Sequence, residues 1–91
     1  MTIKYTSTFL KQLKKSDVRT RKAFKERLLI FTKNPHDLEL NDHPLKREYI
    51  GFSSIDITSD YRAIYKTVTQ KNQIYIYFTL FGTHAQLYED K

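Results

Sequence analysis

The chain has 91 residues, with 16 lysines and arginines against 10 aspartates and glutamates, and it contains no cysteine. The length allows one domain with a modest core, so we expect a single domain over residues 1–91. The lack of cysteine excludes disulfide bonds, thiolate nucleophiles and the usual structural zinc sites. The formal net charge of +6 favours a polyanionic partner, nucleic acid first, but a charge that only keeps the domain soluble explains it equally well.

Nothing near the N-terminus resembles a signal peptide, and no apolar run approaches the length of a membrane span. We therefore expect a cytoplasmic protein that does not bind a membrane. The chain has seven tyrosines and no tryptophan, and tyrosine can stack on unpaired bases as well as fill a core. Having only two glycines and two prolines argues against a disordered chain.

The N-terminal half is predicted to contain a short strand and two helices. Residues 2–6 alternate weakly, which indicates the strand. Apolar residues then recur at helical spacing in a first helix and in a second that runs to about Lys33. Asn34 and Pro35 stop the second helix, because a residue before proline is pushed out of helical geometry. Most lysines and arginines of this half are expected on solvated helix faces, and some on a surface for an anionic partner.

The C-terminal half is predicted to form a meander of strands. After a polar connection, they are expected at residues 45–50, 53–58, 61–68 and 74–81. The last strand alternates most regularly, and the side chains expected on its core face are Ile74, Ile76, Phe78 and Leu80. Gly82 then turns the chain, so that His84 lies at the tip of a rigid element. Residues 84–90 can add one helical turn against the sheet.

Helices that precede a run of strands predict an α+β fold. We expect the N-terminal strand and the two helices to pack on one face of a mainly antiparallel sheet, with the other face left open.

Two histidines carry the first functional hypothesis. His43 lies in the stiff segment DHPL, and His84 ends the longest strand. Taken alone, each is more simply a surface histidine, and Asp60 is most simply a turn residue. Arg62 lies in a mid-sheet strand, where burial without an anionic ligand or a carboxylate neighbour is costly. Lys66 projects from the same sheet face.

These residue types on one basic sheet face suit RNA cleavage without a metal ion. The 2′-hydroxyl must lose a proton to attack its own phosphodiester, and the 5′-oxygen must gain one as it leaves. Imidazoles serve in both roles near neutral pH, and an arginine or lysine stabilises the extra negative charge of the transition state. No two histidines share a metal-ligand spacing and no phosphate loop is present, so neither a metal nor a small-molecule cofactor is expected.

Three motifs resemble those of the RelE/ParE superfamily of bacterial toxins, and most of all its YafQ branch. They are residues 42–45 (DHPL), 60–65 (DYRAIY) and 82–88 (GTHAQLY). The similarity extends from about Phe9 to Tyr88 and implies a RelE-like fold. The DHPL and GTHxxLY pair at this separation is fairly specific, whereas DYRxIY is shared across the superfamily.

The resemblance implies a type II toxin that cleaves mRNA in the ribosomal A site and is neutralised by a cognate antitoxin protein. The expected partners are therefore the antitoxin, the ribosome and mRNA. The catalytic residues that carry over are His43, Asp60, His84 and Tyr88. The RNA-binding residues expected around them are Lys46, Arg47, Tyr61, Arg62 and Lys66. The two histidines form the proton-transfer pair, and which of them is the base stays open.

Two positions depart from the YafQ pattern. Tyr61 replaces a tryptophan, and Asp56 stands where a further histidine would align. Two other functions remain as alternatives: a ParE-like protein that inhibits DNA gyrase by binding it, and a non-catalytic module that binds RNA or the ribosome. A binding inhibitor has no need of the two histidines, which favours the ribonuclease.

Overall fold

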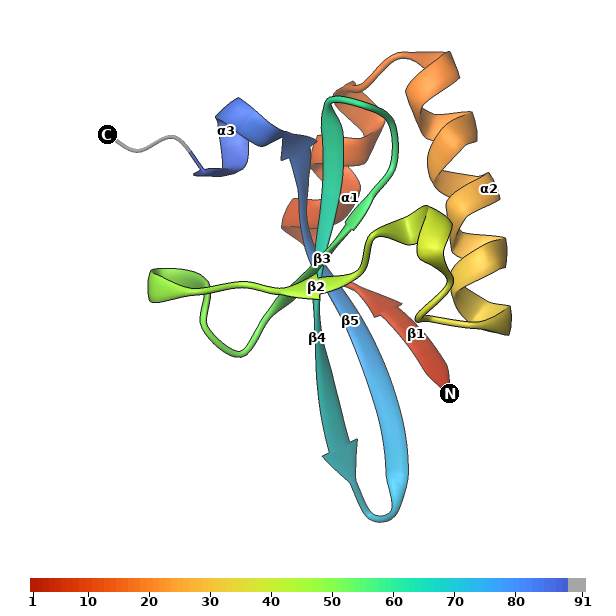
Figure 1. The fold of residues 1–91 in the computed structure, drawn as a ribbon, viewed down its shortest axis with the longest axis vertical. Helices are drawn as coiled ribbons and strands as arrows, with labels where there is room; N and C mark the ends of the chain where they lie inside the picture. The colour runs from red at the N-terminus through yellow and green to blue at the C-terminus, as the bar shows by residue number, and fades with distance from the viewer. Residues whose placement is uncertain (89–91) are drawn as a thin grey trace.

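The computed structural model describes residues 1–88 and forms an α+β fold in which two helices cover one face of a five-stranded sheet (Figure 1). The strands are β1 (Thr2–Tyr5), β2 (His43–Pro44), β3 (Ser53–Asp56), β4 (Tyr61–Gln70) and β5 (Gln73–Thr83). The α-helices are α1 (Ser7–Lys15), α2 (Val18–Lys33) and α3 (His84–Tyr88), and two 3₁₀ turns lie at Leu38–Leu40 and Arg47–Tyr49.

The sheet order is β1-β5-β4-β3-β2, with β1 parallel to β5 and every other pair antiparallel. The predicted mainly antiparallel sheet with helices on one face is therefore confirmed. The β4–β5 hairpin extends well beyond the other strands (Figure 1). No helix within residues 1–88 combines the length and apolar character that crossing a bilayer requires.

Local capping explains where the two long helices begin and end. The Thr6 hydroxyl accepts a hydrogen bond from the Phe9 backbone N–H at 3.1 Å, and the Asp17 carboxylate accepts one from Thr20 at 2.7 Å. Such caps satisfy N–H groups that lack a partner inside the helix. The same Thr20 N–H bond lowers the pKa of Asp17 below its ordinary value. Helix α2 ends at Lys33, as Pro35 predicts.

The core is a cluster of aromatic rings between the helices and β5. Phe78 is fully buried, and its ring centroid lies 5.6–6.0 Å from those of five neighbours: Tyr5, Phe9, Phe24, Phe31 and Tyr65. Offset and edge-to-face aromatic pairs add specific stability to the burial of their apolar surface. This cluster joins β1, α1, α2, β4 and β5 into one unit.

A β-bulge changes the predicted alternation of β5. The register passes from Ile64 opposite Leu80 to Tyr65 opposite Phe78, so Thr79 has no partner on β4. The extra residue reverses the faces beyond it. The predicted alternation points Phe81 away from the core face, but Phe81 is buried in the core. Leu80 instead lines a hollow with Thr6, Tyr49 and Phe52. The prediction was right for Ile76 and Phe78 and wrong for Leu80. It was also wrong for Ile74, which lies beyond the core and is 50% exposed.

The strand predicted at residues 45–50 is also wrong. The Leu45 N–H donates to the Phe52 carbonyl, and the chain between them closes on itself through a 3₁₀ turn. Arg47 and Gly51 have φ values of 58° and 93°, in the left-handed region that extended strands do not use. The backbone groups of this segment are thus satisfied locally rather than by a neighbouring strand.

Residues 84–88 form the predicted helical turn, with Leu87 buried against the sheet. The rest of that prediction, residues 89 and 90, lies outside the described residues, as does the end of the domain predicted over 1–91.

A buried tyrosine ties the segment before β2 to the sheet. The Tyr65 hydroxyl donates to Asp42 Oδ1 at 2.7 Å, the Asp42 side chain is only 9% exposed, and burial raises the pKa of Tyr65. We expect Tyr65→Phe to lower the free energy of unfolding by about 1–3 kcal/mol, because the carboxylate is left without its donor. Urea unfolding measures this change.

Tyr75→Phe is the matched control for Tyr65→Phe, since its hydroxyl donates to Gln73 at an exposed site. We expect that substitution to change stability by less than about 0.5 kcal/mol. Equal effects of the two substitutions would contradict an anchoring role for the Tyr65–Asp42 bond.

Candidate active site

An open pocket of about 350 Å³ lies where the segment around β2, strands β3 and β4, and helix α3 meet. Seven residues line it: Asn41, His43, Leu45, Asp56, Arg62, His84 and Tyr88. Side chains alternate along a strand, and Ala63 and Tyr65 of β4 belong to the core cluster under the helices. Arg62 therefore projects from the opposite, open face. The pocket lies on the face that the sequence predicted to be free.

The backbone fixes the ring of His43. Its Nδ1 lies 2.7 Å from the Asn41 carbonyl oxygen. A carbonyl oxygen only accepts hydrogen bonds, so this contact requires the proton on Nδ1. In the neutral imidazole, Nε2 is then the nitrogen with the free lone pair. His43 is exposed, which leaves it accessible to a large substrate.

His84 and Tyr88 enter the pocket from one turn of α3. Their ring centroids are 4.6 Å apart, and the Tyr88 hydroxyl donates to Ser54 Oγ at 3.1 Å. The turn is held at both ends: the His84 N–H donates to the Asp60 carbonyl at 2.9 Å, and Tyr49 Oη donates to the Leu87 carbonyl at 2.9 Å. The short helix is thus positioned by the sheet rather than by its own length.

Gly82 permits this close packing of α3. A Cβ at Gly82 would lie 2.9 Å from Gln86 Oε1, which accepts a hydrogen bond from the Thr83 N–H at 2.8 Å. Any larger residue would displace the Gln86 amide that caps the turn. The prediction that Gly82 ends the strand was wrong, because Gly82 pairs with Arg62 and β5 continues to Thr83. Its lack of a Cβ leaves room for the Gln86 amide beside the turn that carries His84.

Arg62 is held rigidly at the pocket wall. Its Nη1 donates to the carbonyl oxygens of Thr58 and Tyr61 at 3.0 Å and of Ser59 at 3.3 Å. Its Nε lies 3.0 Å from Asp56 Oδ1. The carboxylate neighbour that the sequence offered as one explanation of a mid-sheet arginine is thus Asp56.

Four of the nine predicted site residues line this pocket: His43, Arg62, His84 and Tyr88. The other five do not. Asp60 is exposed, and it contributes its backbone carbonyl to the α3 turn. Lys46, Arg47 and Lys66 are exposed beside the pocket-forming segments, and Lys66 Nζ lies 5.6 Å from the centroid of the Phe52 ring.

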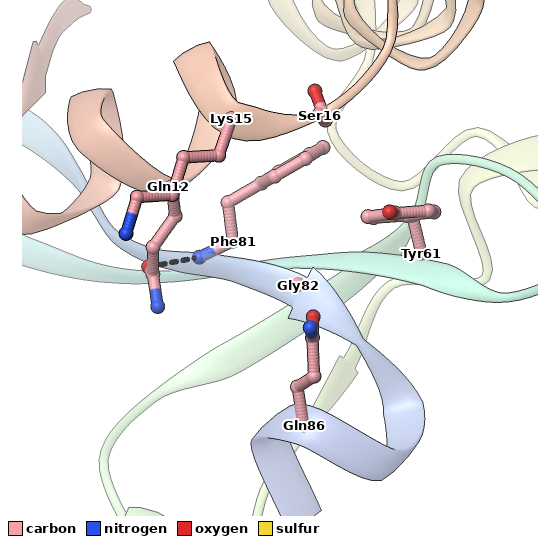
Figure 2. A pocket seen from close by; sticks show the side chains of 7 residues that line it. All are labelled: Gln12, Lys15, Ser16, Tyr61, Phe81, Gly82 and Gln86. Carbon is pink, nitrogen blue, oxygen red and sulfur yellow. Dashed lines mark hydrogen bonds between the residues drawn. The ribbon is translucent and has the colours of Figure 1, made fainter.

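Tyr61 lies on the helix side of the sheet, because it precedes Arg62 and strand neighbours point to opposite faces. Its ring stacks on Phe81 with centroids 5.5 Å apart. It lines a second pocket of about 320 Å³, to which Gln12 and Lys15 of α1 and Gln86 of α3 also contribute (Figure 2). The Gln12 Oε1 atom there accepts a hydrogen bond from the Phe81 N–H at 2.9 Å (Figure 2).

Three pocket residues were missed or left without a role by the sequence interpretation: Asn41, Leu45 and Asp56. Leu45 belongs to the DHPL motif, so the sequence could have indicated that it lines the pocket together with His43. Asn41 has φ 49° and ends a 3₁₀ turn, and asparagine tolerates that left-handed conformation. An asparagine two residues before the motif histidine was the available signal.

Comparison with known proteins places the chain in a family. The model of "Bacterial toxin of type II toxin-antitoxin system, YafQ" matches residues 1–89. A comparison with curated protein sequences finds no match.

The similar solved structures include several toxins. YafQ from E. coli BL21(DE3) is 30% identical with TM-score 0.69, covering 94% of this chain and 96% of that chain. The E. coli DinJ–YafQ complex matches at 31% identity and TM-score 0.66, with 94% and 96% covered. The RelB–RelE antitoxin–toxin complex of Methanococcus jannaschii matches at 20% identity and TM-score 0.70, with 97% and 98% covered, which shows a shared fold. The chain therefore belongs to the YafQ family of bacterial toxins of type II toxin–antitoxin systems.

Proposed function

We propose that this toxin is a ribosome-dependent endoribonuclease that cleaves mRNA in the A site by metal-independent acid–base catalysis and so inhibits translation. The observation that carries the proposal is the convergence of two histidines, an arginine and a tyrosine on one open pocket. His43 and Arg62 come from two different motifs, and His84 and Tyr88 come from a third. The convergence of the three motifs is therefore a property of the fold. The YafQ and RelE toxins resemble this chain over nearly its whole length.

His43 is the proposed general base. Its Nδ1–H donates to the Asn41 carbonyl, so neutral His43 presents Nε2 to accept the proton of the ribose 2′-hydroxyl. The 2′-oxygen then forms a bond to the adjacent phosphorus, and the bond from phosphorus to the 5′-oxygen breaks. The products are a 2′,3′-cyclic phosphate and a 5′-hydroxyl end.

His84 is then the group that protonates the leaving 5′-oxygen. Arg62 stabilises the negative charge that gathers on the phosphate oxygens, and its carbonyl contacts keep it in place before substrate arrives. Tyr88 contacts the His84 ring and offers an aromatic face to a base. Asp60 acts through its backbone, by holding the first residue of α3.

The remaining predicted residues are proposed to bind RNA outside the reacting centre. Lys46, Arg47 and Lys66 are exposed cations that can contact phosphates. Tyr61, on the other side of the sheet, could reach only a nucleotide that passes the end of β4.

The test is an assay with translating ribosomes and a defined mRNA. We expect the wild-type protein to cut the message within the A-site codon, and to leave the same mRNA intact when ribosomes are omitted. Intact mRNA on translating ribosomes would refute the ribonuclease. Inhibition of gyrase supercoiling, or ribosome binding without cleavage, would then identify which alternative is correct.

We also propose that a cognate antitoxin binds this toxin, as DinJ accompanies YafQ in the E. coli complex. The surface that fits it is a groove of about 540 Å³ between α1 and α2. Its apolar lining includes Leu10, Leu13, Val18 and Leu28, and its cationic rim consists of Arg21, Lys22 and Lys25. An amphipathic acidic segment matches both its apolar floor and its charge.

We expect Leu10→Glu to weaken antitoxin binding by at least about 30-fold, since it places a carboxylate in the apolar floor of the groove. Leu10 is 49% exposed, so the toxin itself should stay folded. Leu29→Glu is the control, because Leu29 is an exposed leucine of α2 outside the groove. Calorimetric titration of the antitoxin into each purified toxin variant measures the two affinities. Equal affinities of the Leu10→Glu and Leu29→Glu toxins would show that the antitoxin binds elsewhere.

A further inference from the structure

A series of polar contacts joins the arginine of the pocket to one of its histidines. We propose that Asn41 and Asp56 are positioning residues that together fix the Arg62 guanidinium and the His43 imidazole relative to each other. The inference rests on the proposed ribonuclease function and adds two residues to it. Asn41 lies outside the three motifs, and Asp56 replaces the histidine expected at its position.

The first link is the ion pair between Asp56 and Arg62. Both side chains are largely buried, at 28% and 17% exposed. Asp56 Oδ1 is buried and has no aligned hydrogen-bond donor among residues 1–88, so the Arg62 charge 3.0 Å away is what compensates it. Moving the guanidinium away would leave an uncompensated carboxylate, which is strongly unfavourable. Asp56 therefore restrains Arg62 electrostatically, in addition to the carbonyl contacts at its other end.

The second link is Asn41, which makes one contact through its side chain and another through its backbone. Its Nδ2 donates to Asp56 Oδ2 at 3.3 Å, and its carbonyl oxygen accepts the bond from His43 Nδ1 at 2.7 Å. The left-handed φ of 49° turns the two groups of one residue toward different partners. The position of Asp56 on β3 is thus transmitted to the imidazole of His43 on β2.

This arrangement bears on the reaction because base and phosphate ligand must act on adjacent atoms of one nucleotide. A displacement of about 1 Å in such a pair can lower a rate about 100-fold. The negative charge of Asp56 opposes phosphate binding, so its presence in the pocket is not explained by substrate affinity. If Asp56 only opposed phosphate binding, removal of its charge would favour the reaction. If Asp56 positions Arg62, removal of its charge lowers the cleavage rate.

The experiment compares Asp56→Asn, Asn41→Gly and the double variant in single-turnover and steady-state cleavage on translating ribosomes. Glycine keeps the left-handed backbone and the carbonyl of residue 41 and removes only the amide side chain. Asn72→Gly is the matched control: Asn72 also has positive φ, at 67°, but it lies at the tip of the β4–β5 hairpin.

We expect kcat to fall about 10- to 100-fold in Asp56→Asn and about tenfold in Asn41→Gly, with KM not raised in either. The double variant should lose no more than Asp56→Asn alone, because coupled residues are non-additive. Asn72→Gly should match the wild type. An unchanged kcat, a raised KM with unchanged kcat, or fully additive losses would each overturn the positioning role.

A second measurement does not depend on cleavage. Nitrogen NMR of the imidazoles should show His43 protonated on Nδ1 in the wild type. A mixture of tautomers is expected in Asn41→Gly, because the carbonyl of residue 41 is kept but is no longer held against Nδ1 by the amide contact to Asp56. If the wild type cuts no mRNA but the tautomer shifts as stated, the ribonuclease is refuted and the contact network stands. If the wild type cleaves mRNA and the His43 tautomer of Asn41→Gly is the same as in the wild type, the contact network is refuted and the ribonuclease function stands.

Discussion

Replacing His84 by alanine is expected to reduce mRNA cleavage on translating ribosomes by about 10²–10⁴-fold, the usual contribution of a general acid or base. The reason is that the leaving 5′-oxygen then departs without a proton donor, while the pocket keeps Arg62 and His43. His84 is exposed, so its removal should change the free energy of unfolding by less than about 0.5 kcal/mol. Cleavage rate and urea midpoint are measured on the same preparation.

His36→Ala is the control for His84→Ala. His36 is also an exposed histidine, its side chain is 86% exposed, and it does not line the pocket. Its cleavage rate should stay within about twofold of the wild type, as for a surface substitution. A His84→Ala protein that is folded and cleaves as fast as the His36→Ala protein would remove His84 from the mechanism.

Replacing Phe78 by alanine is expected to have the largest effect on stability, a loss of about 3–5 kcal/mol. Phe78 is fully buried and contacts rings from β1, α1, α2 and β4. A domain of this size has a total stability of about 5–14 kcal/mol, so the variant should be close to unfolding. Thermal and urea unfolding followed by circular dichroism measure the loss.

Ile74→Ala tests whether that loss comes from the core rather than from β5 in general. Ile74 lies four residues earlier on the same strand and is 50% exposed. We expect it to lower stability by no more than about 1 kcal/mol, because little buried surface is removed. If both variants lost the same amount, the aromatic cluster would not be the centre of stability.

The helices and the long hairpin were predictable because their signals are local. Apolar spacing indicated α1 and α2, and Pro35 marked where α2 ends. The alternation of β4 and β5 around a polar turn indicated the hairpin. In each case the residues that define the element are within a few positions of one another, so no long-range contact was needed.

The failures have a different cause. The bulge at Thr79 depends on how β5 pairs with β4, and it places Phe81 rather than Leu80 in the core. Residues 45–50 were predicted as a strand, but the Leu45 N–H donates to the Phe52 carbonyl and the segment between them forms a 3₁₀ turn. Strand pairing is decided by partners distant in the sequence, which periodicity does not report.

The sequence by itself determined the α+β fold and the family, and it indicated four candidate site residues that share the pocket: His43, Arg62, His84 and Tyr88. These could be predicted because motifs and periodicity depend on residues that are close together in the sequence. Only the tertiary structure decided which residues share a pocket. It brought Asn41 and Asp56 beside Arg62 and His43, and it left Asp60 and Tyr61 outside. The physical reason is that the pocket forms where β2, β3, β4 and α3 meet, and their meeting depends on strand register and on burial of the aromatic core.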